Sequence, residues 1–107
     1  MAYYIVKAIA DQHKLSDLRE RLDSGEIEGM RPFGQALDFS LREARLAPDG
    51  YAIWEEEDYC SPPLAMERAA LLDHYFSDLS VERVEKDQGW ARLADLPVLW
   101  TTVTDYL

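Results

Sequence analysis

Two segments of this 107-residue chain are apolar on both of the faces that a β-strand presents. In Ala2–Ala10, every residue except Lys7 is apolar, and Tyr51–Trp54 is apolar throughout. A strand with one face in water alternates apolar with polar residues, whereas a strand covered on both sides does not. We therefore expect both segments to be central strands of a sheet whose two faces are covered.

The residues between these two strands predict a helix and a further strand. Leu15, Leu18 and Leu22 are spaced for one face of a helix. Apolar and polar residues alternate over 37–42, which predicts a half-buried strand. Positions 47–50, with the sequence Ala-Pro-Asp-Gly, favour a tight turn, because proline suits its second position and glycine accepts a positive φ. The strand at 37–42 is thus expected to form a hairpin with the strand that begins at residue 51.

The second half of the chain predicts a long helix, a strand and a C-terminal extension. Apolar residues over 64–79 form a broad helical stripe. A short strand is expected over 81–86. The extension 87–107 carries several leucines and Trp100, so we expect it to cover other apolar surface. Its segment 100–106 has the composition of a strand.

The order strand, helix, hairpin, helix, strand over residues 2–86 resembles the ferredoxin-like superfold. That resemblance implies an α+β, two-layer sandwich in which two helices cover one face of a four-stranded antiparallel βαββαβ sheet. Residues 1–107 are expected to form one domain, since a chain of this length holds a single core. Such folds carry many unrelated activities, so the function has to be argued from a site.

Charge and composition argue against several classes of partner. The formal net charge is −10, and residues 55–107 carry twelve acids against four bases. Nucleic acids and anionic membranes attract clustered lysine and arginine, so neither is an expected partner. No stretch reaches the ~20 apolar residues that span a bilayer, and the chain begins without the basic start of a secretory signal. The expected location is the cytoplasm, which the single cysteine, Cys60, also suits.

The acidic run over 55–58 joins the third predicted strand to the long helix. On a strand, Glu55 and Glu57 share one face, where two carboxylates could bind a cation or move a proton. The alternative is a solvated strand end whose charges discourage aggregation. The neighbouring Trp54 and Tyr59 are candidate ligand-binding residues.

Cys60 and His74 are further candidates for catalysis. Cys60 precedes the predicted helix, whose dipole can lower the pKa of a thiol, while a buried, inert cysteine is the alternative. His74 could act with Glu55 or Glu57 as a metal ligand or general base, although a surface histidine also fits its place in a helix. Nothing in the spacing links these residues, so no metal site and no cofactor is predicted.

Two functions from different classes remain open. The first is a noncatalytic dimeric module that binds a small molecule, or a basic protein partner through its acidic half. The second is a small cofactor-free enzyme, resembling the dimeric α+β barrel oxygenases and isomerases, in which a carboxylate and a histidine move protons. The apolar second face of the sheet predicts a homodimer, with the C-terminal extension as the competing cover.

Overall fold

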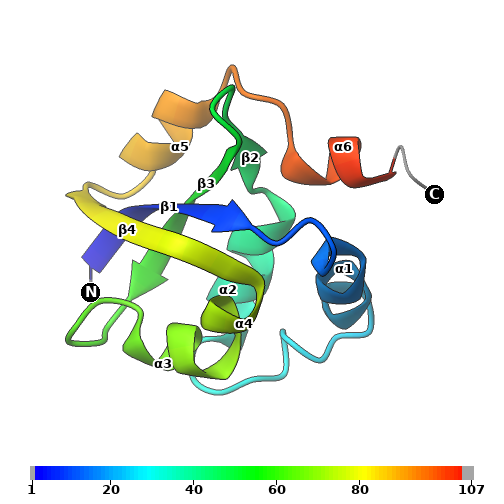
Figure 1. Cartoon of the computed structure of the whole chain (residues 1–107). Coiled ribbons are helices and arrows are strands. Elements are labelled where there is room, and N and C mark those ends of the chain that lie inside the picture. The colour runs from blue at the N-terminus through cyan, green and yellow to red at the C-terminus, as the bar shows by residue number, and fades with distance from the viewer. Residues whose placement is uncertain (1, 105–107) are drawn as a thin grey trace.

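A computed structural model describes residues 2–104 of the chain, and the side chains of residues 2–101. Four strands form one antiparallel sheet in the order β2-β3-β1-β4 (Figure 1). The central strands are β1 (Ala2–Ala10) and β3 (Tyr51–Asp58), and the edges are β4 (Phe76–Val84) and β2 (Arg45–Leu46). The predicted α+β class, the antiparallel sheet and the two central strands are therefore confirmed.

The hydrophobic core lies on one face of this sheet. Val6 and Ala8 of β1 and Trp54 of β3 are fully buried there. α1 (Leu15–Asp23) contributes Leu15, Leu18 and Leu22, as their spacing predicts. The core is closed by a second helical segment, which consists of α3 (Ala65–Glu67), the π-helical turn η1 (Arg68–Leu72) and α4 (Asp73–Tyr75).

The predicted strand over 37–42 is wrong, because these residues belong to the helix α2 (Gly34–Arg42). Leu37 and Leu41 are fully buried, and their spacing of four residues is that of one helical face. Phe39, which completed the apparent alternation, is 58% exposed and takes no part in the core. At the start of α2, a Cβ on Gly34 would lie 2.4 Å from the backbone oxygen of Ile27, so only glycine fits this close approach.

The predicted helix over 64–79 is too long, and the predicted strand over 81–86 starts too late. The helical segment ends at Tyr75, and β4 begins at Phe76, which pairs with Ala10 of β1. Phe76 is buried and Leu79 packs against the core, and both belong to β4. In the sequence they continue the apolar stripe of the helix, which makes the predicted helix too long. Apolar residues at such a junction satisfy both periodicities.

The predicted turn at 47–50 is confirmed, but the strand before it is only two residues long. The N–H of Gly50 donates to the oxygen of Ala47 at 2.9 Å, and Gly50 has a φ of +90°. β2 pairs with β3 only as far as Ile53, so within residues 2–104 the edge of β3 beyond this residue has no partner strand. α2 lies along this open edge, where the Ser40 hydroxyl donates to the backbone oxygen of Glu55 at 2.6 Å.

The described part of the C-terminal extension, residues 87–104, covers apolar surface, as expected, but it is helical and adds no strand. α5 (Gln88–Leu93) lies across the face of the sheet opposite the core (Figure 1), where Gly89 approaches Ile5 of β1. The strand predicted over 100–106 is wrong for its described part, because α6 (Leu99–Thr104) is a helix. Trp100 is buried and donates its indole N–H to the oxygen of Leu41. Within the described chain, no helix is long and apolar enough to cross a membrane.

Candidate functional site

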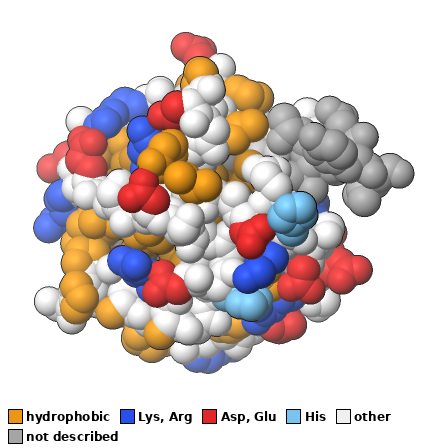
Figure 2. All heavy atoms as spheres, viewed as in Figure 1, with side chains coloured by type: hydrophobic (Ala, Val, Ile, Leu, Met, Phe, Trp, Pro, Cys, Tyr) orange, Lys and Arg blue, Asp and Glu red, His pale blue; other side chains and the backbone are white. Residues whose placement is uncertain are grey.

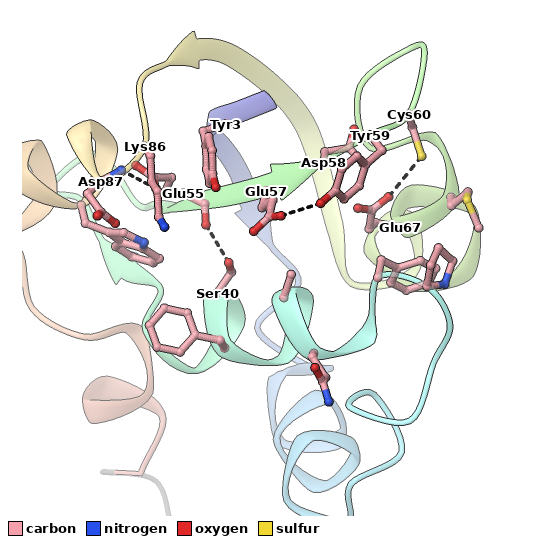
Figure 3. A pocket seen from close by; sticks show the side chains of 17 residues that line it. Tyr3, Ser40, Glu55, Glu57, Asp58, Tyr59, Cys60, Glu67, Lys86 and Asp87 are labelled. Atoms are coloured by element: carbon pink, nitrogen blue, oxygen red, sulfur yellow. Dashed lines mark hydrogen bonds between the residues drawn. The ribbon is translucent and has the colours of Figure 1, made fainter. Parts of the chain in front are cut away.

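A cavity of about 760 Å³ opens beside the unpaired edge of β3, between α2, α5 and the loop that follows β3 (Figure 3). Five aromatic side chains form what we call the aromatic wall: Tyr3, Phe33, Phe39, Tyr59 and Trp90. The rings of Phe39 and Trp90 meet edge to face, with centroids 6.2 Å apart and planes at 88°. The cavity exists because α2, rather than a continuous strand, covers this edge of the sheet.

Exposed apolar surface is concentrated at this cavity. Five large apolar side chains are exposed among those described, and three of them, Phe39, Tyr59 and Met66, line it. Tyr59 is 71% exposed although it follows a buried strand directly. Contiguous apolar surface that is left open to water usually marks a binding site, because covering it would release free energy.

Glu55, one of the two carboxylates predicted to converge, has a structural role. It is buried and accepts hydrogen bonds from the backbone N–H groups of Asp87 at 3.0 Å and Gly89 at 2.8 Å. These donors lie at the start of α5, where backbone N–H groups lack partners within the helix. Glu55 thereby fastens α5 to the sheet.

Glu57 lies on the same face of β3 as Glu55 but has a different hydrogen-bond partner. It is half-buried, lines the cavity and accepts a hydrogen bond from the hydroxyl of Tyr59 at 2.8 Å. This hydrogen bond raises the pKa of the Tyr59 phenol, because the carboxylate favours its protonated form. Tyr59 is thus held at the mouth of the cavity, which is consistent with its prediction as a ligand-binding residue.

Glu56 and Trp54 lie on the opposite, core-facing side of β3. Trp54 is fully buried, does not line the cavity, and donates its indole N–H to Oε1 of Glu56 at 3.0 Å. Glu56 is also fully buried, and its Oε2 has no hydrogen-bond partner among the described residues. Burial first, and the charge of Glu67 next, raise the pKa of Glu56 well above its ordinary value.

Asp58, Cys60 and Glu67 meet at one end of the cavity, which we call the acidic end. One ligand atom of each lies within 4.8 Å of the other two, and Sγ of Cys60 is 3.8 Å from Oε1 of Glu67. Asp58 and Glu67 are 3% and 1% exposed. The carboxylate of Asp58 accepts a hydrogen bond from the backbone N–H of Leu64 at 2.6 Å. Leu64 has a φ of +63°, which turns the chain into the helical segment.

The acidic end favours protonated side chains. Burial, and after it the neighbouring Asp58, raises the pKa of Glu67 to about 7, against the effect of a backbone hydrogen bond. A hydrogen bond with the backbone of Met66 favours the thiolate of Cys60. Burial and Asp58 outweigh it and raise the pKa of the thiol, opposite to the direction expected from a helix dipole.

Within residues 2–101, no ion pair joins a lysine or arginine to Glu56, Asp58 or Glu67. Lys86 also lines the cavity, but Figure 3 shows it at the opposite end. The region around the acidic end therefore gathers buried carboxyl groups without a cation from these residues.

The two histidines lie away from the cavity. His13 and His74 are exposed, and neither is among the residues that line it. Figure 2 shows the histidine side chains on the molecular surface, among acidic and basic neighbours. The ring of His74 packs edge to face on Tyr75, while its backbone oxygen accepts a hydrogen bond from Lys14. The structure thus brings Cys60 to the cavity with Glu57, and not His74.

Sequence reasoning missed Glu67 as a site residue, although a signal for it exists. Leu64, Glu67 and Leu71 follow one another at spacings of three and four residues, which places Glu67 on the buried face of the helical segment. A carboxylate within an apolar stripe is an anomaly, because glutamate is rarely buried without a partner.

Comparisons with family models, with curated proteins and with solved structures found no match for this chain.

Proposed function

We propose that this protein is a noncatalytic module that binds a small, flat, largely apolar organic molecule in the cavity beside β3. One observation carries the proposal: three of the five exposed large apolar side chains line this one cavity. Its volume of about 760 Å³ lies within the range of roughly 300 to 1,000 Å³ that is usual for small-molecule sites. The aromatic wall offers ring faces and edges for stacking.

The charge of the cavity limits the ligand to neutral or positively charged molecules. Glu57, Asp58 and Glu67 line it, against the single charge of Lys86 at the other end. An anionic ligand would have to approach buried carboxyl groups, which is unfavourable in a region of low dielectric constant. A cation would be attracted both by these carboxylates and by the faces of the aromatic rings.

The alternative function, a cofactor-free enzyme with a carboxylate and a histidine, has less support. Neither histidine is among the described residues that line the cavity. A general base must come within hydrogen-bond distance of the proton that it removes. A ligand in this cavity would therefore meet carboxyl groups without a histidine to pair with them.

We also propose that the protein is a homodimer with a fold of the ferredoxin-like kind, in which α2 is added between α1 and β2. The strand order β2-β3-β1-β4 supports this assignment. α5 meets the outer face of the sheet near Ile5 and Glu55, whereas Ile9 of the same face is 41% exposed. A second copy of the chain, packed on this part of the face, would cover it.

The binding proposal can be tested with three naphthalene derivatives of similar size: naphthylmethylamine, naphthylmethanol and naphthoic acid. Their binding is followed by tryptophan fluorescence in buffer with EDTA, and the variant Trp90→Phe identifies the signal from the cavity. We expect the amine and the alcohol to bind and the acid to bind at least about tenfold more weakly, which is 1.4 kcal/mol. Equal affinity for the acid would contradict the assignment.

Two variants locate the binding. Phe39→Ala and Tyr59→Ala remove exposed rings of the aromatic wall, so they should weaken binding at least about tenfold with little effect on folding. Ile9→Ala removes an exposed apolar side chain from the sheet face instead and serves as the matched control. If all three variants bind the amine equally well, the cavity is not its site.

A further inference from the structure

The acidic end of the cavity gathers carboxyl groups that form no ion pair with a lysine or arginine of residues 2–101. Asp58 and Glu67 are almost completely buried, and Oε2 of Glu67 has no hydrogen-bond partner within the part of the chain that the structure describes. Oε2 of Glu56 is likewise buried and without a hydrogen-bond partner among the described residues, and the charge of Glu67 acts on Glu56. Carboxylates buried without a partner are strongly destabilising, so such a group takes up a proton or a cation.

The geometry of the acidic end suits a small metal ion. Tetrahedral coordination at 2.0 to 2.3 Å from each ligand atom places sulfur and oxygen ligands roughly 3.5 Å from each other. Sγ of Cys60 and Oε1 of Glu67 are 3.8 Å apart, and the ligand atoms of Asp58, Cys60 and Glu67 all lie within 4.8 Å of one another. Shifts of well under a bond length would bring all three to one ion.

We propose that Asp58, Cys60 and Glu67 form a binding site for a divalent transition-metal ion of the zinc class. Figure 3 shows the Glu67 carboxylate directed at Cys60 and Asp58, the arrangement from which an ion would be held. A thiolate with two carboxylates favours Zn²⁺ and Co²⁺, whereas Mg²⁺ and Ca²⁺ take oxygen ligands. All three residues line the cavity, so a fourth coordination position faces it and stays open for water or a ligand atom.

The competing occupant of this site is a proton. Metal binding would replace the proton of the Cys60 thiol by the metal–sulfur bond and release it to the buffer, together with any proton held between the two carboxyl groups. The affinity of the site for metal should therefore rise with pH. The proposed metal site is independent of the organic ligand, since the ligand experiment above is carried out in EDTA.

The test uses the full chain, stripped with EDTA, dialysed and titrated with Co²⁺. We expect a sulfur-to-cobalt charge-transfer band in the near ultraviolet that saturates at one ion per chain and is displaced by Zn²⁺. Cys60→Ser should abolish the band. Glu67→Gln, which keeps the shape of the side chain and removes its charge, should weaken Zn²⁺ binding in calorimetry by at least about tenfold.

Glu85→Gln is the matched control, because it removes the same charge at an exposed position outside the cavity and outside the three-residue cluster. Its affinity for Zn²⁺ should stay within about twofold of the parent, well below the effect expected for a ligand. Circular dichroism confirms that each variant is folded. Absence of the band, equal Zn²⁺ affinity in the Glu67 and Glu85 variants, or binding of Mg²⁺ at the same concentration would each overturn the proposal. The acidic end would then bind protons and no metal ion.

Discussion

The indole of Trp54 donates its N–H to one oxygen of Glu56, two positions further along β3, and both side chains are fully buried. The pair joins a fully buried tryptophan of the core to a carboxyl group whose second oxygen has no partner among the described residues. One hydrogen bond offsets only part of the cost of removing such a group from water. Glu56 is therefore a place where the fold is less stable than it could be.

Glu56→Gln should stabilise the protein at neutral pH. The folded-state pKa of Glu56 lies above the unfolded value of about 4.3. As the pH rises above the unfolded-state pKa, Glu56 loses its proton in the unfolded chain but keeps it in the folded protein. The free energy of unfolding therefore falls until the pH has passed the folded-state pKa. Glutamine keeps an oxygen for Trp54 and removes this loss. Each kcal/mol gained should raise Tm by about 4 °C or more.

The measurement is thermal unfolding between pH 5 and 8 in EDTA, so that no bound cation contributes. The parent should lose stability across this range, and the variant should lose less of it. Some decline should remain, since Glu67 also has a raised pKa of about 7. Glu85→Gln, at an exposed position, is the control. A parent protein whose stability rises with pH over this range would contradict the role given to Glu56.

Gly89→Ala should destabilise the protein by about 1 to 3 kcal/mol, as overpacking in a core does. The added Cβ would lie 2.8 Å from Oε1 of Glu55 and 2.9 Å from Cγ1 of Ile5, so α5 would be pushed from the sheet. Gly29→Ala is the matched control, because its Cβ would meet only ordinary contacts at 3.5 and 3.6 Å. Urea unfolding of both variants measures the difference, and equal stabilities would show that α5 is not held closely.

Leu72→Ala should cost about 2 to 5 kcal/mol in urea unfolding, because the removed atoms leave a cavity in the core. Leu72 is fully buried at the end of η1, on the face of the helical segment that covers the sheet. Ala70→Ser, at an exposed position of the same turn, should change stability by less than about 0.5 kcal/mol. A loss for Leu72→Ala as small as that of the control would mean that this side chain does not support the core.

Light scattering at micromolar concentration should give a mass of twice the 12.3 kDa of one chain. Ile9→Glu should shift the protein to the monomer, since it places a charge within the apolar face proposed as the interface. Phe39→Ala, at the cavity, should leave the mass unchanged. A parent mass near 12.3 kDa would refute the dimer, and α5 would then be the element that covers the outer face of the sheet.

The parts of the fold that could be predicted are those in which one periodicity dominates. β1 is apolar on both faces at every position but Lys7, a pattern that favours a central strand. At 37–42, by contrast, the exposed Phe39 supplies a false alternation, because its ring serves the cavity and not the core. Side chains that line a cavity and not the core break the pattern that otherwise indicates the fold.

The candidate site was only partly predictable for a different reason. The acidic run indicates the right segment, but the two carboxylates of one strand face have separate roles, since Glu55 binds backbone N–H groups and Glu57 faces the cavity. Cys60 lies beside the helical segment, as its place in the sequence predicts. Its partner Glu67 belongs to α3, seven positions further along the chain. A contact between them depends on how the intervening loop is packed, which the sequence pattern does not show.

The two-residue length of β2 offers a criterion for deciding whether a related chain can have the same cavity. Where the hairpin arm that leads into the Ala-Pro-Asp-Gly turn is longer, pairing would continue along β3 past Ile53, and the sheet would occupy the space into which the cavity now opens. Where the arm is equally short and a small polar residue stands at the place of Ser40, a helix can again lie against the bare strand. The number of residues between the helix and the turn would then indicate which of these chains can have a cavity at this place.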